Sequence, residues 1–122
     1  MYEITVESSF SAAHRLMDYQ GPCENLHGHN WLVKATVRCS ELDKSGLGID
    51  FRILKTHLKD ILDRFDHKDL NAVLIDPVQN PSSENIARII FKLLEQKLAS
   101  WNGKVARVKV YETPGSCAAY YE

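Results

Sequence analysis

Apolar and polar residues alternate along the first fourteen positions of the chain, as they do in a strand with one covered face. One parity carries the apolar side chains of Tyr2, Ile4, Val6, Phe10 and Ala12. We expect a strand over residues 2–14 in which His14 continues that parity and points to the covered face. A bulge near Ser8 and Ser9 would reverse the direction of His14.

A second alternating stretch follows a polar turn that contains Gly21-Pro22. Its apolar parity comprises Trp31, Val33, Ala35, Val37 and Cys39. We expect a strand over residues 29–39, and counting back gives His27 and His29 the same parity as Trp31. A third strand is predicted over residues 105–112 and a short fourth one over residues 118–121.

Two segments between these strands show the 3.6-residue period of amphipathic helices. The first runs from about Arg52 to Phe65, with Asp50 as its N-cap. The second begins at Ser82 or Ser83 and continues to about Ser100, where Asn102-Gly103 stops it. Residues 40–48 and 66–81 are predicted to be loops.

Alternating strands and two amphipathic helices predict an α+β domain that occupies residues 1–122. We expect a four-stranded antiparallel sheet with both helices packed on one face. The other face carries mixed polar side chains, which are either solvated or in contact with another subunit: Thr5, Glu7, Thr36, Arg38, Arg107 and Lys109.

The composition of the chain bears on which partners it binds and on where in the cell it is found. The 122 residues include 15 basic and 16 acidic ones, so no strong field for a polyanion is expected and no nucleic-acid partner is predicted. The N-terminus lacks the pattern of a signal peptide, and no apolar run approaches the roughly 20 residues of a membrane span. Three cysteines without an export signal favour reduced thiols, and we expect a cytoplasmic protein with no membrane partner.

Three histidines could bind one metal ion. In an extended strand, His27 and His29 project to the same side, and His14 is the best candidate for a third ligand. Three neutral imidazoles leave one position of a tetrahedral zinc ion open, as in catalytic sites. The alternative is that these are ordinary turn and strand histidines, but their shared apolar parity would then bury unpaired polar rings.

Cys23 lies four residues before His27 and is a candidate for chemistry. A nearby cation would lower the pKa of its thiol and make it a base or nucleophile. It could also be an inert free cysteine, or a fourth zinc ligand that closes the site.

Asp66 and His67 follow the first predicted helix. The aspartate could orient the imidazole and raise its basicity, provided that a loop lets the neighbouring side chains meet. The alternative is a histidine at a helix C-terminus, stabilised by the helix dipole.

Glu112 continues the core-facing parity of the third strand, where a carboxylate is costly unless it is paired. It could accept two parallel hydrogen bonds from a flat N–H donor array such as an arginine, a pterin or a guanine ring. It could equally be a strand-end glutamate turned to solvent.

Together these segments resemble the 6-pyruvoyl-tetrahydropterin synthase and 6-carboxy-tetrahydropterin synthase family. The matches span nearly the whole chain in the family's order: Phe10-Ser11-Ala12-Ala13-His14-Arg15-Leu16, Cys23-x-x-x-His27-Gly28-His29, Gly48-Ile49-Asp50-Phe51, Asp66-His67-x-x-Leu70-Asn71, Asn80-Pro81-Ser82-Ser83-Glu84-Asn85 and Glu112-Thr113. The resemblance implies the tunnelling fold (T-fold), in which three subunits join their sheets into a barrel and two trimers form a hexamer. Active sites then lie at subunit interfaces.

The resemblance also implies roles for the candidate residues. His14, His27 and His29 would bind zinc, and Glu112 would anchor a pterin ring. Cys23 would transfer protons together with Asp66 and His67, which in the family come from a different subunit.

The implied substrate is 7,8-dihydroneopterin triphosphate, and the implied reaction is a lyase reaction that eliminates triphosphate. The compact chain favours 6-carboxy-5,6,7,8-tetrahydropterin and acetaldehyde as products, in the queuosine (7-deazapurine) pathway. The alternatives are 6-pyruvoyl-tetrahydropterin, or a 6-hydroxymethyl-dihydropterin for folate, because Glu24 adjoins Cys23. From another class, a non-catalytic zinc-binding or purine-binding module remains open.

Overall fold

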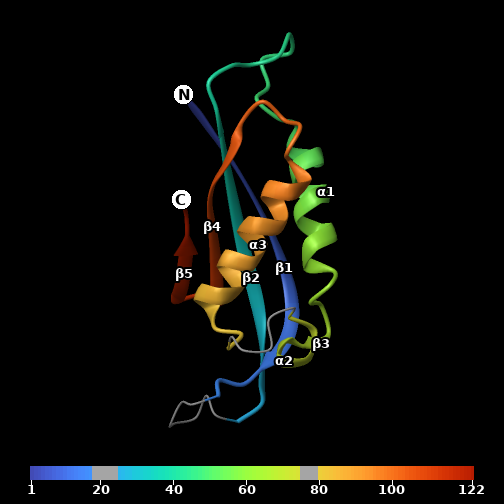
Figure 1. Cartoon of the computed structure of the whole chain (residues 1–122), viewed down its shortest axis with the longest axis vertical. Helices are drawn as coiled ribbons and strands as arrows, with labels where there is room; N and C mark the ends of the chain where they lie inside the picture. The colour runs from blue at the N-terminus through green and yellow to red at the C-terminus, as the bar shows by residue number, and fades with distance from the viewer. Residues whose placement is uncertain (18–24, 75–79) are drawn as a thin grey trace.

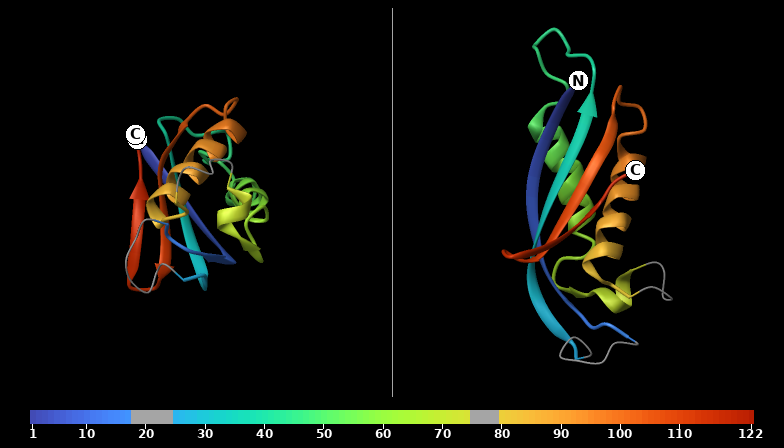
Figure 2. Two further views of the ribbon diagram at one scale, coloured as in Figure 1. Left: turned by 60° about the horizontal axis from the view of Figure 1, so that its bottom comes forward. Right: turned by 90° about the vertical axis from the view of Figure 1, so that its left-hand side faces the viewer.

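The computed structural model describes residues 1–17, 25–74 and 80–122. Its elements follow the order β1 (Tyr2–His14), β2 (His27–Cys39), α1 (Phe51–Leu62), β3 (Lys68–Asp69), α2 (Leu70–Val73), α3 (Ser83–Lys97), β4 (Lys104–Thr113) and β5 (Ser116–Tyr120). In Figure 1 the long strands form one layer and α1 and α3 form the other. The right-hand view of Figure 2 shows both helices on the same face of the twisted sheet.

The sheet has the order β3-β1-β2-β4-β5. The pairs β1–β2, β2–β4 and β4–β5 are antiparallel, so the predicted α+β architecture with four antiparallel strands and two covering helices is confirmed. The fifth strand, β3, is parallel to β1 and pairs with Ala12 and Ala13. The prediction of a loop was wrong for β3 and α2, because elements of two and four residues are too short to show a periodic pattern.

The register of β1 and β2 is continuous from Tyr2 opposite Cys39 to His14 opposite His27. No bulge interrupts β1, so the parity counted from the sequence holds through to His14. The helices end earlier than predicted: α1 stops at Leu62 rather than near Phe65, and α3 stops at Lys97.

Helix caps and apolar stripes explain how the helices cover the sheet. The Asp50 carboxylate accepts a hydrogen bond from Arg52 N at 2.7 Å, and the Ser82 hydroxyl accepts one from Asn85 N at 3.2 Å. The stripes of α1 and α3 pack on the inward side chains of β1, β2 and β4 in one continuous core. In the described ranges, no helix is both long and apolar enough to cross a membrane.

The uncovered face of the sheet satisfies its polar groups locally. The hydroxyls of Thr5 and Thr36 hydrogen-bond to each other across β1 and β2 at 2.8 Å. Beside them, Arg38 donates to Glu3 at 3.0 Å. The two faces of the same strands therefore differ sharply in chemistry.

Candidate metal centre

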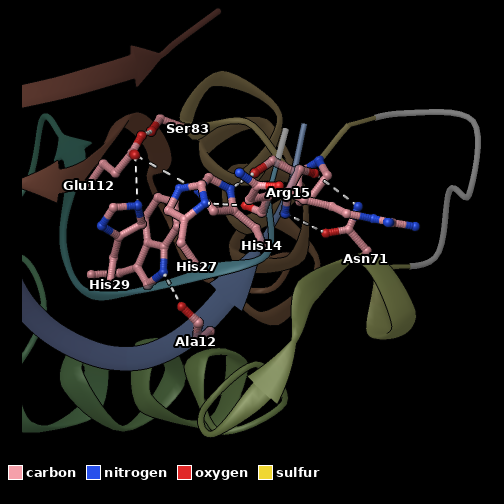
Figure 3. Close-up of polar contacts among 11 residues, drawn as sticks. Ala12, His14, Arg15, His27, His29, Asn71, Ser83 and Glu112 are labelled. Carbon is pink, nitrogen blue, oxygen red and sulfur yellow. Dashed lines mark hydrogen bonds and ion pairs between the residues drawn. The ribbon is translucent and has the colours of Figure 1, made fainter. Parts of the chain in front are cut away.

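Three imidazoles meet where β1 ends and β2 begins (Figure 3). His14 lies opposite His27 in the register, and His29 lies opposite Ala12 on the same inward face. The ring centroids are 4.7 Å apart for His14 and His27, 4.8 Å for His27 and His29, and 5.2 Å for His14 and His29. The fixed strand register thus brings together three side chains that the sequence places 13 and 15 residues apart.

Trp31 separates this cluster from the apolar core. Its ring lies edge-on to both neighbours, with centroid distances of 4.9 Å to His14 and 5.3 Å to His29. The indole N–H donates to the Ala12 carbonyl at 3.1 Å, which fixes the ring across β1 and β2. The histidines therefore rest on a rigid, fully buried wall.

Backbone carbonyls orient two of the rings. The Nδ1 atom of His14 lies 2.7 Å from the Pro81 carbonyl, and that of His27 lies 2.6 Å from the Asn25 carbonyl. Since a carbonyl only accepts, each Nδ1 carries a proton, and in the neutral ring each Nε2 then keeps its lone pair. This is the arrangement by which metal-binding histidines are usually held.

Two of the Nε2 atoms are buried without a hydrogen-bond partner among the described residues, namely those of His14 and His29. Glu112 Oε1 lies 2.8 Å from the Nε2 of His29 and 3.8 Å from that of His14. The contact with His29 has the distance of an ion pair, but Nε2 and Oε1 form no hydrogen bond. Buried, unsatisfied nitrogen atoms of this kind mark a site that fits a further ligand.

Electrostatics favour a neutral imidazole at His29. Burial lowers the pKa of His29 below its ordinary 6.5, the Glu112 carboxylate opposes that shift, and the His14 and His27 rings reinforce it. Neutral imidazole is the form that binds a metal ion.

The described residues contain one group of potential ligands that could hold an ion: His14, His27, His29 and Glu112, whose donor atoms lie within 4.8 Å of one another. Three imidazole nitrogens and a carboxylate suit zinc better than magnesium or calcium, which prefer oxygen ligands. The donor set and its unsatisfied nitrogen atoms therefore fit the predicted zinc ion. Glu112, predicted to bind substrate, lies within the cluster itself.

A pocket of about 210 Å³ adjoins the cluster. It is lined by the start of α3, by the start of β5, by Leu16 and by two site residues. The lining residues are His14, Leu16, Ser82, Ser83, Glu84, Glu112, Ser116, Cys117 and Ala118. The Ser83 hydroxyl reaches Glu112 Oε2 at 3.4 Å. The sequence pattern identified these serines only as the start of the helix, because their approach to Glu112 depends on the packing of α3 against β4.

Asp66 and His67 form a pair on the edge of β1, apart from this pocket. Asp66 accepts from Ser11 N at 2.9 Å, and His67 N donates to Ser11 O at 2.6 Å. His67 adopts a left-handed backbone with φ 58°, and its Nδ1 comes within 3.0 Å of Asp66 Oδ2. The loop therefore lets neighbouring side chains meet, as the prediction required.

The environment of this pair is exposed and polar. The Ser11 N–H lowers the pKa of Asp66 below its usual 3.8, and His67 acts in the same direction. The side chain of His67 is 82% exposed and does not line the pocket. Cys23, the remaining predicted catalytic residue, lies outside the described residues.

Fold and site together define a class: an α+β protein with a histidine-rich centre at one end of an antiparallel sheet. The model of the 6-pyruvoyl tetrahydropterin synthase family matches residues 3–122. The chain belongs to that family.

Curated relatives and solved structures agree with this assignment. A Synechocystis protein named 6-carboxy-5,6,7,8-tetrahydropterin synthase is 37% identical over 99% of this chain and 94% of its own. A Haemophilus influenzae protein of the same name is 31% identical over the whole of both chains. The structure of Caenorhabditis elegans 6-pyruvoyl tetrahydropterin synthase matches with a TM-score of 0.81 and 31% identity, over 100% of this chain and 97% of that one.

Proposed function

We propose that the protein is a zinc-dependent lyase that converts 7,8-dihydroneopterin triphosphate and one water molecule to 6-carboxy-5,6,7,8-tetrahydropterin, acetaldehyde and triphosphate. The observation that carries this proposal is the convergence of three imidazoles, two of them with buried unpartnered Nε2 atoms, beside a pocket. The names of the relatives in Synechocystis and Haemophilus influenzae favour the 6-carboxy product.

In this proposal His14, His27 and His29 hold the zinc ion through their Nε2 atoms. A zinc ion bound there supplies a Lewis acid that polarises the oxygen atoms of the substrate side chain. Trp31 and the Pro81 carbonyl keep the rings in place, so little reorganisation is needed on binding.

Glu112 is proposed to bind the pterin ring. Its carboxylate faces both the cluster and the pocket, and it can accept two parallel hydrogen bonds from the guanidine-like edge of a pterin. The close approach of Oε1 to His29 Nε2 does not prevent this, because each carboxylate oxygen has a second lone pair, and Oε2 meets only the Ser83 hydroxyl among the described residues.

Proton transfer is assigned to Cys23 and to the Asp66–His67 pair. The thiolate of Cys23 would take a proton from the carbon next to a substrate hydroxyl, and His67, oriented by Asp66, would exchange one on the other side. Because His67 does not line the pocket of its own chain, we propose that a second copy supplies the pair in a trimer or hexamer.

The test is to incubate the zinc-loaded protein with 7,8-dihydroneopterin triphosphate and to identify the products by mass spectrometry. We expect 6-carboxy-5,6,7,8-tetrahydropterin and acetaldehyde. A 6-hydroxymethyl product would instead assign a role to Glu24, and a 6-pyruvoyl product would place the chain in the other branch. Bound zinc without turnover would favour a non-catalytic module.

A Cys23→Ala variant separates the two possible roles of the thiol. We expect turnover to be abolished while zinc content stays near that of the unaltered protein. Loss of zinc in this variant would instead make Cys23 a fourth ligand of a closed site.

A further inference from the structure

Two asparagine side chains hold the backbone that follows His14. Asn71, in the first turn of α2, accepts from Arg15 N at 2.9 Å and donates to Arg15 O at 3.0 Å. The side-chain amide of Asn71 therefore hydrogen-bonds to both the N–H and the carbonyl of Arg15 (Figure 3).

Asn80 makes the same pair of contacts two residues further along. It accepts from Met17 N at 2.8 Å and donates to Met17 O at 2.7 Å. Alternate residues of an antiparallel strand exchange two hydrogen bonds with a neighbouring strand in this way. The two amides therefore substitute for a partner strand along residues 15–17, beyond the end of β1.

Asn80 is next in the chain to Pro81, the residue whose carbonyl orients His14. Pro81 follows Asn80 directly and accepts the hydrogen bond from His14 Nδ1 at 2.7 Å. Asn85, in the first turn of α3, donates to the Asn80 carbonyl at 2.9 Å and holds this turn against the helix. The segment after His14 is thus held to Asn80, and the turn that carries the Pro81 carbonyl is held to α3.

From this geometry we infer that Asn71 and Asn80 are positioning residues, which keep His14 in the tautomer and orientation that a metal ion requires. The inference rests on the proposed zinc site, but not on catalysis. His14 is 1% exposed and packs against Trp31, and its Nε2 has no hydrogen-bond partner among the described residues, so the Nδ1 contact is the hydrogen bond that sets its tautomer and direction within that packing. If residues 15–17 shift from the Asn80-Pro81 turn, that contact is lost.

The substitution that probes this inference is Asn80→Asp. It keeps the size of the side chain and the acceptor for Met17 N, but places a carboxylate oxygen against the Met17 carbonyl. Asn71→Asp makes the same change at Arg15, and Asn80→Gln retains both polar groups on a longer stem. Asn102→Ala is the control. Asn102 is exposed and lies just before the start of β4, whereas Glu112 lies near the end of that strand.

Two readouts separate positioning from mere stability. In the metal-free protein, long-range ¹H–¹⁵N correlation spectra report which ring nitrogen of His14 carries the proton. Zinc affinity is measured by competition with a chromophoric chelator. Thr36→Val serves as a destabilised control, because it loses a hydrogen bond on the opposite face of the sheet.

We expect Asn80→Asp and Asn71→Asp to lower zinc affinity about 10- to 100-fold, the range for groups that orient a ligand. Both should also lose the single Nδ1–H tautomer of His14, whereas Asn102→Ala and Thr36→Val should keep it. A folded Asn80→Asp protein with the unaltered tautomer and a zinc affinity within twofold would overturn the inference.

Two further measurements keep the test decisive. If Asn80→Asp does not fold, Asn71→Asp and Asn80→Gln are judged by the same two readouts. In the unaltered protein the amide protons of Arg15 and Met17 should be protected from hydrogen exchange, and rapid exchange at both would overturn the inference without any variant. If the unaltered protein binds no zinc, the zinc proposal fails, while the tautomer spectra still test the asparagines.

Discussion

The inward faces of β1 and β2 change character along their length. Around Phe10 and Val33 they carry apolar side chains sealed beneath α1 and α3, whereas at the His14–His27 end the same parity carries imidazoles. In the first region burial stabilises the fold, because the inward side chains there are apolar and pack against one another. Burial in the second leaves two nitrogen atoms unsatisfied, a cost that only a ligand can offset.

The largest expected change in stability comes from a substitution in the packed region. Phe10 is 3% exposed and its ring stacks on Trp31 at a centroid distance of 5.9 Å. Phe10→Ala should lower the free energy of unfolding by about 3–5 kcal/mol, because it leaves a cavity under the helices. Urea denaturation of the metal-free protein measures this, and a loss below about 1 kcal/mol would contradict the description of a sealed core.

The next effect concerns the unsatisfied region. Zinc at about 100 times its Kd should raise the free energy of unfolding by about 2.7 kcal/mol, because it binds the folded state alone. His29→Ala should abolish this gain at the same zinc concentration, whereas His57→Ala on α1, outside the cluster, should retain it. Thermal melts with and without zinc provide the measurement; an equal gain in both variants would show that zinc binds elsewhere.

A smaller effect tests a polar pair that is already satisfied. Thr36→Val removes the hydroxyl that contacts Thr5 at 2.8 Å on the uncovered face. The free energy of unfolding should fall by about 0.5–1.5 kcal/mol, and zinc should not alter that difference. A change that depended on zinc would mean that the two faces of the sheet are energetically coupled.

The smallest expected effect is a pH dependence of the metal-free protein. The pKa of His29 is lowered below 6.5 by burial, so the unfolded state binds this proton more readily than the folded one. Stability is therefore full above pH 6.5 and declines as the pH falls from 6.5 through the folded pKa. Denaturation midpoints in the presence of a chelator should show this decline, and His29→Ala should make it shallower.

The sequence predicted the long elements because their patterns repeat. Thirteen residues of alternating parity were enough to predict β1 and the inward direction of His14. The apolar stripes of the helices predicted α1 and α3. The same counting of parity assigned His14, His27 and His29 to one face of the sheet. Their roles as zinc ligands, and those of Cys23, Asp66 and His67 in proton transfer, stay predictions.

Other features depend on contacts that no local pattern encodes. The strand β3 has two residues and lies beside β1 directly after Asp66 and His67, which hydrogen-bond to Ser11. The placement of Glu112 beside His29 requires β4 to lie next to β2 in the observed register. The roles of Asn71 and Asn80 likewise arise from hydrogen bonds that span 56 and 63 residues.

The two carbonyls that orient His14 and His27 differ in how early a folding chain can supply them. His27 uses a carbonyl two residues before it, which is in reach as soon as that turn forms. His14 uses one that lies 67 residues further along the chain, and such a contact waits for the start of α3 to dock. His14 therefore acquires its orienting hydrogen bond only when α3 docks, whereas His27 obtains its own within one turn.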